Sequence, residues 1–289
     1  MAGDPRAAGP AAPLFSRRLN RQIGNPHSGG IAAKPAAKFR AANSRDLLAC
    51  ARVCHRSIRD MSRRMGQPPP AFRPADLLPF LRYVLKTEPR SVQVALVDRK
   101  IVAFAVTVLR GKWHFLSLFF ALPGKQSQGF GRPVLARAFE EPKPPRGSAR
   151  CVVASLDLRA QALYLKFGMH PRTVLYFVSG KPVEMQTPRL AVELHQLGTT
   201  GRMTKRALDV AARYDRPLRG VRRDDDHRFL MRLVKGSRFF EARRDGRTIG
   251  YVMIRGNGAI GPAGMRDPSL GEGIFAAAVA KAHGLGPKN

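Results

Sequence analysis

The sequence predicts a mixed α/β (α+β) fold, in which helices flank a central sheet and a smaller unit of similar layout follows. Residues 116–122, L-S-L-F-F-A-L, form an apolar run of strand length that ends at Pro123, as expected of a strand covered on both faces. A glycine turn and an amphipathic helix follow this run, and two β-branched segments precede it. The 289 residues leave room for one large or two modest domains.

The turn after this strand is the most informative stretch of the chain. It reads, in order, Gln126, Ser127, Gln128, Gly129, Phe130, Gly131 and Arg132. Pro133 suits a first helical position, and an apolar helical repeat follows it: Val134, Leu135, Ala138 and Phe139. Such a turn directs backbone N–H groups and a helix N-terminus at one point, which favours an anion. Gly129 and Gly131 leave room for a phosphate and Arg132 adds positive charge, although an ordinary strand-to-helix turn is the alternative.

Two common phosphate motifs do not fit the turn. The dinucleotide fingerprint needs a third glycine where Val134 stands, and the P-loop needs a Gly-Lys-Ser/Thr that is absent. Pro123 followed by Gln126-x-x-Gly129-x-Gly131 instead resembles the pyrophosphate-binding signature of the GNAT superfamily of acyl-CoA-dependent N-acyltransferases.

A second segment supports this resemblance. Residues 157–169, D-L-R-A-Q-A-L-Y-L-K-F-G-M, are similar to the second motif of the family, Asn-x-x-Ala-x-x-Leu-Tyr-x-x-x-Gly-Phe. Met169 replaces the usual Phe. Asp157 replaces the usual Asn and puts a negative charge near an anionic coenzyme, so the resemblance implies a coenzyme contact there that the charge weakens.

The resemblance implies where acetyl-CoA binds. The turn 126–132 would hold its diphosphate, and the backbone of Phe119, Phe120 and Ala121 would hold its thioester. In the family, this strand and the next one, here 151–154, splay apart and the coenzyme lies in the V between them. The loop 66–73 would help to shape the pocket for the acceptor.

The catalytic side chains are less well defined. In the family, a tyrosine at the place of Tyr164 is a general acid or a coenzyme ligand, whereas packing against the sheet is the alternative role. No acid lies between Lys100 and Glu140, which leaves His114 as the titratable candidate for a base near the central strand. A structural histidine, with deprotonation through water, is the competing interpretation.

Composition limits the class of protein. The formal charge is +31, from 51 Lys+Arg against 20 Asp+Glu. Such a charge suggests nucleic acid, but the basic residues are scattered, and coenzyme phosphates would also gain from a positive field. No apolar run reaches the roughly eighteen residues of a membrane helix. Three cysteines, Cys50, Cys54 and Cys151, make no disulfide framework and fit the reducing cytoplasm. Cys50, Cys54 and His55 lack a second ligand cluster, so no metal is predicted.

The remaining elements follow from capping and periodicity. Residues 1–40 are expected to be disordered or a spurious extension. Helices are predicted to begin at Asn43–Asp46 and at Pro74–Asp76. Strands are predicted in the first half at 91–97, 101–109, 151–154 and 174–179, and a further helix at 158–167.

The second half repeats this order. After a linker at 181–186 come a helix at 206–214 and a helix capped by Asp224, Asp225 and Asp226 beside His227, for which an Asp/His metal site is the alternative. Strands are predicted at 239–243, 248–254 and 259–262, and a helix at 274–283. No Gln/Arg-x-x-Gly-x-Gly/Ala pattern lies between Gly261 and Ile274, so this half is predicted to be degenerate or truncated.

These inferences predict three parts: an extension (1–40), an N-acetyltransferase domain (41–183) and a second GNAT-like domain (190–289). The first domain would transfer acetyl from acetyl-CoA to a primary amine by direct attack. A non-catalytic acyl-CoA-binding module and a basic nucleic-acid-binding protein are the alternatives. The sequence leaves open the acceptor amine and the oligomeric state, a homodimer included.

Overall fold

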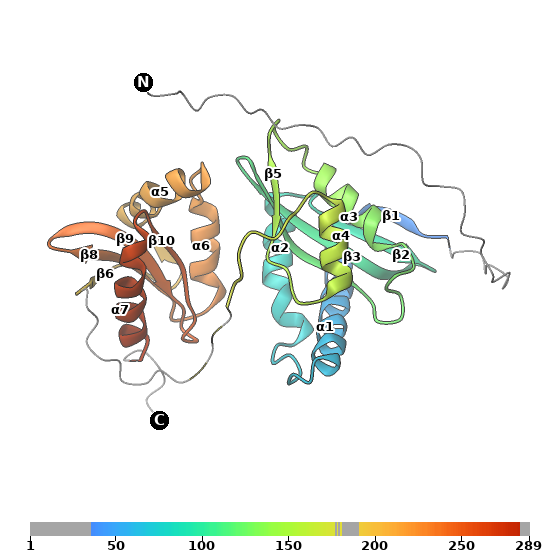
Figure 1. The fold of residues 1–289 in the computed structure, drawn as a ribbon, viewed down its shortest axis with the longest axis horizontal. Helices are drawn as coiled ribbons and strands as arrows, with labels where there is room; N and C mark the ends of the chain where they lie inside the picture. Colours follow the sequence, from blue (N-terminus) through green and yellow to red (C-terminus); the bar gives the residue numbers. More distant parts are fainter. Residues whose placement is uncertain (1–35, 177, 179, 181–190, 284–289) are drawn as a thin grey trace, which may run out of the picture. The chain divides into compact units, whose positions relative to one another are not determined.

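The first half of the chain is built on a five-stranded mixed sheet. The computed structural model describes residues 36–176, 178, 180 and 191–283. The strands of this sheet lie side by side in chain order (Figure 1): β1 (Lys38–Ala41), β2 (Val92–Val97), β3 (Lys100–Arg110), β4 (Trp113–Ala121) and β5 (Ala149–Val152). Neighbours are antiparallel except β5, which is parallel to β4. The predicted mixed sheet is therefore confirmed.

Helices cover both faces of this sheet. They are α1 (Leu47–Arg64) and α2 (Leu78–Thr87) on one face, and α3 (Gly131–Glu140) and α4 (Leu158–Lys166) on the other. Successive residues of β3 point to opposite faces. Phe104 belongs to the core under α1 and α2, whereas Ala103 and Ala105 belong to the core under α3 and α4. In the described part of the chain, no helix is both long and apolar enough to cross a membrane.

The chain enters α1 through a short 3-10 turn, Ser44–Asp46, which shows the predicted capping pattern. The Asn43 side chain accepts a hydrogen bond from the Arg45 amide at 2.9 Å, and Asp46 accepts one from the Asn43 amide at 2.8 Å. This reciprocal capping satisfies donors that the first helical turn leaves without partners. Cys50 and Cys54 then lie buried on the inner side of α1. Within the described residues, no cluster of three metal-ligating side chains exists.

A second five-stranded sheet follows, in the order β10-β9-β8-β6-β7. Its strands are β6 (Glu193–Thr199), β7 (Arg202–Met203), β8 (Arg238–Arg244), β9 (Arg247–Ile254) and β10 (Ile260–Met265). The accompanying helices are α5 (Lys205–Arg219), α6 (Asp224–Leu233) and α7 (Gly271–His283). The core on one face involves α5, and the core on the other involves α7.

The second sheet repeats the first as far as its fourth strand. In each half, a strand and two helices precede an antiparallel hairpin, and a further strand and a helix follow it. β6, β8, β9 and β10 thus correspond in order to β1, β2, β3 and β4. Among the described residues, no strand pairs with the outer edge of β10, where β5 lies in the first sheet.

Asp226 explains the acidic start of α6. All three aspartates lie in the first turn of this helix, as predicted, but none of them is the N-cap residue, which is Arg223. Asp226 accepts hydrogen bonds from Arg110 at 2.6 and 2.9 Å and from the Tyr83 hydroxyl at 2.7 Å. Burial opposes its charge, but the Arg110 guanidinium holds the pKa of Asp226 below its ordinary value. The Asp226 carboxylate therefore forms an ion pair with the Arg110 guanidinium.

Two expectations about strands were wrong. Residues 38–40 belong to β1, where they pair with β2, although the extension 1–40 was expected to be disordered; residues 1–35 lie outside the described residues. Phe39 adds a packing contact with the core under α3. Residues 174–176 and 178 form no strand, and residues 177 and 179 lie outside the described residues. A strand needs a partner, and no described strand pairs with the outer edge of β5.

Candidate functional site

β4 and β5 separate in the middle of β4. Trp113 to Leu116 pair with Ala149 to Val152, whereas the rest of β4 pairs only with β3. The register against β3 shifts at Ser117, which is left without a partner residue there. A bulge of this kind bends a strand and increases its twist. The predicted V is therefore present, and residues 118–121 pair with no strand along this edge of β4, although the Ala121 carbonyl accepts from the side chains of Ser57 and Gln126.

The V opens into a cavity of about 640 Å³, a volume typical of small-molecule sites. The cavity reaches residues of both sheet faces. Ser57, Ile58, Met61 and Arg64 of α1 line it on one face, and Gly131, Leu163 and Tyr164 of α3 and α4 line it on the other. It therefore passes through the layer of the sheet at the place where β4 and β5 part.

The glycine turn faces this cavity. Gly129 has a φ of +89°, in the left-handed region, and a Cβ placed there would meet nothing within 4 Å. Gly131 begins α3, and a Cβ on it would lie 2.9 Å from the ring of Phe119. No side chain caps α3, so its first amides keep donors for a ligand. Pro133 is the third helical residue, where the absence of its N–H still costs nothing.

The residues predicted for the coenzyme divide into two groups. Most of them line the cavity: Phe119, Phe120, Ala121, Gln126, Ser127, Gly129, Gly131, Arg132 and Asp157. Gln128 and Phe130 do not. The Gln128 side chain donates to the Gly124 carbonyl at 2.7 Å and so braces the turn, while Phe130 is buried in the core under α3. Gln126 likewise donates to the Ala121 carbonyl, at 3.2 Å.

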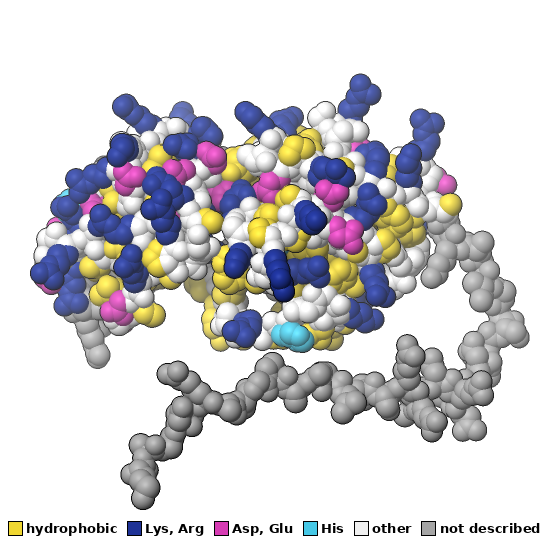
Figure 2. Space-filling model, turned by 90° about the horizontal axis from the view of Figure 1, so that it is seen from above, with side chains coloured by type: hydrophobic (Ala, Val, Ile, Leu, Met, Phe, Trp, Pro, Cys, Tyr) yellow, Lys and Arg dark blue, Asp and Glu magenta, His cyan; other side chains and the backbone are white. Residues whose placement is uncertain are grey.

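Positive charge surrounds the cavity. Five of its lining side chains are cationic, namely Arg64, Lys125, Arg132, Arg159 and Lys166, and Asp157 is its one acid among the described residues. This balance favours a ligand with several negative charges. Figure 2 shows that Lys and Arg side chains elsewhere are spread over the face in view, with Asp and Glu between them. The excess of cationic side chains at the cavity is therefore a better indication of an anionic ligand than the net charge of the chain.

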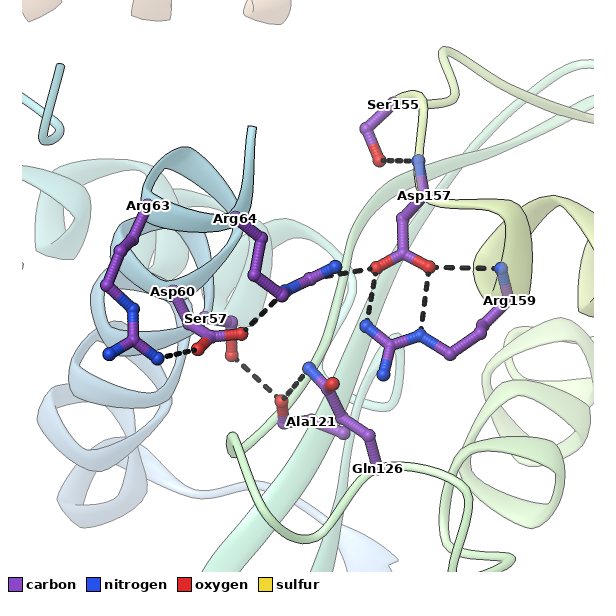
Figure 3. Close-up of polar contacts among 9 residues, drawn as sticks. All are labelled: Ser57, Asp60, Arg63, Arg64, Ala121, Gln126, Ser155, Asp157 and Arg159. Atoms are coloured by element: carbon purple, nitrogen blue, oxygen red, sulfur yellow. Dashed lines mark hydrogen bonds and ion pairs between the residues drawn. The ribbon is translucent and has the colours of Figure 1, made fainter. Parts of the chain in front are cut away.

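Asp157 connects α4 to α1 (Figure 3). It caps α4 by accepting from the Arg159 amide at 3.0 Å, and it accepts from the Arg159 side chain at 2.8 and 3.2 Å. Arg64, at the end of α1, reaches the same carboxylate at 3.2 Å. These contacts, with Arg159 first, hold the pKa of Asp157 well below its ordinary value. The carboxylate is thus fully ionised and engaged, which disfavours a role as a base.

Tyr164 points into the same cavity from α4. Its side chain is buried, and its ring packs edge-on against Phe119 with centroids 6.2 Å apart. Burial, followed by the charge of Asp157, raises the pKa of the Tyr164 hydroxyl to about 12. The phenol therefore keeps its proton across the physiological range and can only donate it.

His114, the predicted base, lies outside the cavity. It is fully buried, edge-on to Phe139 at 5.1 Å between centroids, and no described residue bonds either ring nitrogen. Burial, followed by the charge of Arg150, lowers the pKa of His114 to about 4. It does not line the cavity, so its position does not support the predicted role, and the site has no imidazole among the described residues.

Two residues of α1 that lie at the site, Ser57 and Arg64, were not predicted from the sequence. The Ser57 hydroxyl lies 2.9 Å from the Ala121 carbonyl and joins α1 to the end of β4, and Arg64 bridges to Asp157. Helical periodicity indicates which face of α1 is buried, but it does not reveal which residues meet a loop some ninety positions later. No sequence signal marks either residue.

The splayed mixed sheet, with a glycine turn and a helix after its central strand, is the arrangement of a GNAT-like fold. Two solved structures share the fold of this chain. A presumed acetyltransferase of Pyrococcus horikoshii matches 91% of this chain and 81% of its own, with a TM-score of 0.55 and 17% identity. A GCN5-related N-acetyltransferase of Sphaerobacter thermophilus matches 86% of this chain and 82% of its own, with a TM-score of 0.53 and 18% identity. At these identities the likeness concerns the fold.

The likeness extends over both sheets, because each match spans most of the chain. No family model matches the sequence, and no curated protein matches it either.

Proposed function

We propose that residues 38–183, which are the predicted domain 41–183 with the whole of β1 added, form an N-acetyltransferase domain that uses acetyl-CoA. One observation carries the proposal: the uncapped start of α3 opens onto the same cavity as the free edge of β4. The amides of the turn, with Gly129 leaving room, would hold the diphosphate. Lys125 and Arg132 would add charge, and the β4 backbone from Phe119 to Ala121 would hold the thioester.

The proposed reaction is direct transfer to a primary amine. The amine nitrogen attacks the thioester carbonyl carbon, the C–S bond breaks, and the thiolate of coenzyme A leaves. Tyr164 would donate its proton to that sulfur and regain one from water afterwards; its raised pKa means that the phenol carries the proton at the start of the reaction. The attacking nitrogen loses a proton to water, since the cavity offers no free base among its described residues.

That lack of a base also favours the second candidate, a module that binds acyl-CoA without turning it over. Asp157 is the one acid at the cavity, and its two arginine partners keep it ionised and occupied. A module of this kind would need only the turn and the β4 edge. The two candidates share the coenzyme site and differ only in the fate of the acetyl group.

The second domain, residues 190–289, is proposed to be a degenerate GNAT-like domain without a coenzyme site. The three cysteines, all described, form no disulfide. This absence of a bridge supports the proposal of a cytoplasmic protein.

Two measurements test the proposal in order. Calorimetry with acetyl-CoA and with coenzyme A asks whether the coenzyme binds, and we expect both to bind with one site per chain. Thiol release over a panel of amines then asks whether acetyl is transferred. Binding without amine-dependent thiol release would establish the binding module, and the absence of binding would refute both candidates.

A further inference from the structure

A bridge of charged side chains joins α1 to α4 at the cavity. Its position and charge indicate which class of acceptor the site can bind. The bridge consists of Asp60, Arg64, Asp157 and Arg159, with Arg63 at its outer end (Figure 3). Arg64 donates through Nε to Asp60 at 3.0 Å and through Nη2 to Asp157 at 3.2 Å. One guanidinium is therefore held between two elements that lie 93 positions apart in the chain.

The two faces of the sheet assign the α1 end of this bridge, which is Arg64, to the acceptor side. The glycine turn and α3 lie on the face where the coenzyme would enter, and α1 lies on the opposite face. With the coenzyme in the V, an amine would approach from the face of α1, where Ser57, Met61 and Arg64 line the cavity. Arg64 is the one charged residue of α1 that lines the cavity.

The carboxylates of the bridge are already occupied. Asp60 accepts from Arg63 and Arg64, and Asp157 accepts from Arg64, from the Arg159 side chain and from the Arg159 amide. Their side chains are 18% and 16% exposed, against 42% for Arg64 and 49% for Arg159. The surface that the bridge presents to an incoming molecule is therefore guanidinium, and the acids are turned inward.

Charge and geometry indicate what this surface can bind. Of the bridge residues that line the cavity, two are arginines, Arg64 and Arg159, and one is an acid, Asp157, which leaves one unit of positive charge. A guanidinium has five N–H donors in a planar fork that fits a carboxylate. Arg64 uses Nε and Nη2 for its two acids, and no described residue bonds its Nη1. A single carboxylate would match both the net charge and the free donors, whereas an ammonium group would be repelled.

We propose that the acceptor is an amine that also carries a carboxylate, and that Arg64 binds this carboxylate on the α1 side of the cavity. The proposal rests on the proposed function and names its substrate class. Arg64 is then a specificity-determining residue, which Asp60 and Asp157 hold in place so that little rotamer freedom is lost on binding.

The experiment uses matched amines of equal chain length. Linear amino carboxylates from glycine to 6-aminohexanoate are compared with the amino alcohols and diamines of the same length, with thiol release as the readout. We expect kcat/KM to favour the amino carboxylates over the diamines by at least about tenfold, the effect of one charge-assisted contact. Arg64→Gln should remove this preference through KM, and Arg64→Lys should restore part of it.

Arg63→Gln is the control, because Arg63 bonds the same Asp60 but is 82% exposed and does not line the cavity. It should keep the wild-type preference. Acetyl-CoA affinity is measured for each variant, so that a failed fold or coenzyme site is seen separately. If acetyl-CoA does not bind the wild type, the proposed function itself fails. If acetyl-CoA binds the wild type, any one of three results overturns the inference. These are a preference for diamines, no acetylation of any amino carboxylate, and an Arg64→Gln variant that keeps the wild-type preference for amino carboxylates.

Discussion

The turns before α3 and α7 hold the same place in the two repeats but carry opposite charge. Before α3, Lys125 and Arg132 flank two glycines, and no side chain caps the helix. Before α7, Asp267 accepts from the Ser269 amide at 2.9 Å, and Glu272 lies in the first turn of the helix. Carboxylates at a helix start occupy the position that favours an anion and repel a phosphate. The second half therefore repeats the topology of the first without the features of the proposed binding site.

β4 and β10, the strands that precede these two turns, also differ in what lies along their outer edges. β4 shares its outer edge between β5 and the cavity, because the bulge at Ser117 separates the two strands. β10 pairs with β9 alone and has no described neighbour from which to separate. The cavity of about 480 Å³ in the second half is lined by α5, β8 and β9 instead. The proposed coenzyme site thus combines a splayed pair of strands with an uncapped turn, and the described part of the second half has no such pair of strands after β10.

The largest expected effect comes from closing the turn before α3. Gly129→Val puts a branched side chain at a φ of +89° and into the open mouth of the turn. We expect the Kd for acetyl-CoA to rise about 100-fold, because the strained turn can no longer present its amides. Calorimetry measures this change.

Gly258 is the matched control in the second half. Its φ is +84°, and a Cβ on this residue would likewise meet nothing within 4 Å. Gly258→Val should therefore lower the melting temperature by a few degrees, as Gly129→Val does, and leave acetyl-CoA affinity unchanged. An equal loss of affinity in both variants would show that strain alone, and not the site, is responsible.

A second comparison concerns the buried tyrosines of the two halves. Tyr164→Phe should lower kcat about 30-fold, less than many general acids contribute because a thiolate leaves readily, while acetyl-CoA affinity stays near that of the wild type. Tyr214 lies in α5 and donates to the Thr248 carbonyl at 2.8 Å. Tyr214→Phe should affect stability only. Steady-state kinetics with one amine distinguishes the two, and an unchanged kcat in Tyr164→Phe would remove the proposed acid.

The sequence predicted the parts of the site that are local in the chain. The turn 126–132 and the motif 157–169 each bring their residues together within one or two elements, so spacing alone identifies them. Arg64 and Ser57 were missed because their partners, Asp157 and Ala121, come from other elements. A contact between distant segments depends on how α1 packs over the sheet, which hydrophobic periodicity does not determine.

The strand predictions were wrong for a related reason. Residues 174–176 and 178 have the composition of a strand, yet Val174 and Tyr176 are exposed and unpaired with any described strand. Residues 38–41 have little such composition, yet they form β1 because β2 offers a free edge. In both cases the available partner, and not the propensity of the segment, decided the outcome.

The third prediction is a pH profile without an enzymic base. Asp157 is ionised throughout, since its pKa is held well below the ordinary range, and Tyr164 stays protonated up to a pKa of about 12. The neutral fraction of the acceptor amine rises about tenfold per pH unit below its own pKa, so kcat/KM should rise with the same slope. Two acceptors of different pKa should give midpoints that differ accordingly. A midpoint near 6 to 7 shared by both acceptors would reveal a base on the protein.

The smallest expected effect is a change in acetyl-CoA affinity. It distinguishes Asp157 from Asp267, the residues that cap helical turns in the two halves. Asp157→Asn keeps a good capping residue and removes one negative charge from the cavity, so acetyl-CoA affinity should rise only about twofold, because Arg64, Arg159 and salt already screen this charge. Asp267→Asn, a substitution at a cap outside the cavity, should leave affinity unchanged.

The cost of Asp157→Asn should appear in stability and depend on pH. In the folded protein, Arg159 and then Arg64 hold the pKa of Asp157 below its unfolded value of about 3.9. The wild-type carboxylate therefore stabilises the fold fully above that value, and this advantage disappears as the pH falls toward the lower folded pKa. Thermal unfolding at pH 7 and near pH 3 measures it. A melting-temperature difference that stays constant between these pH values would mean that the ion pairs of Asp157 do not stabilise the bridge between α1 and α4.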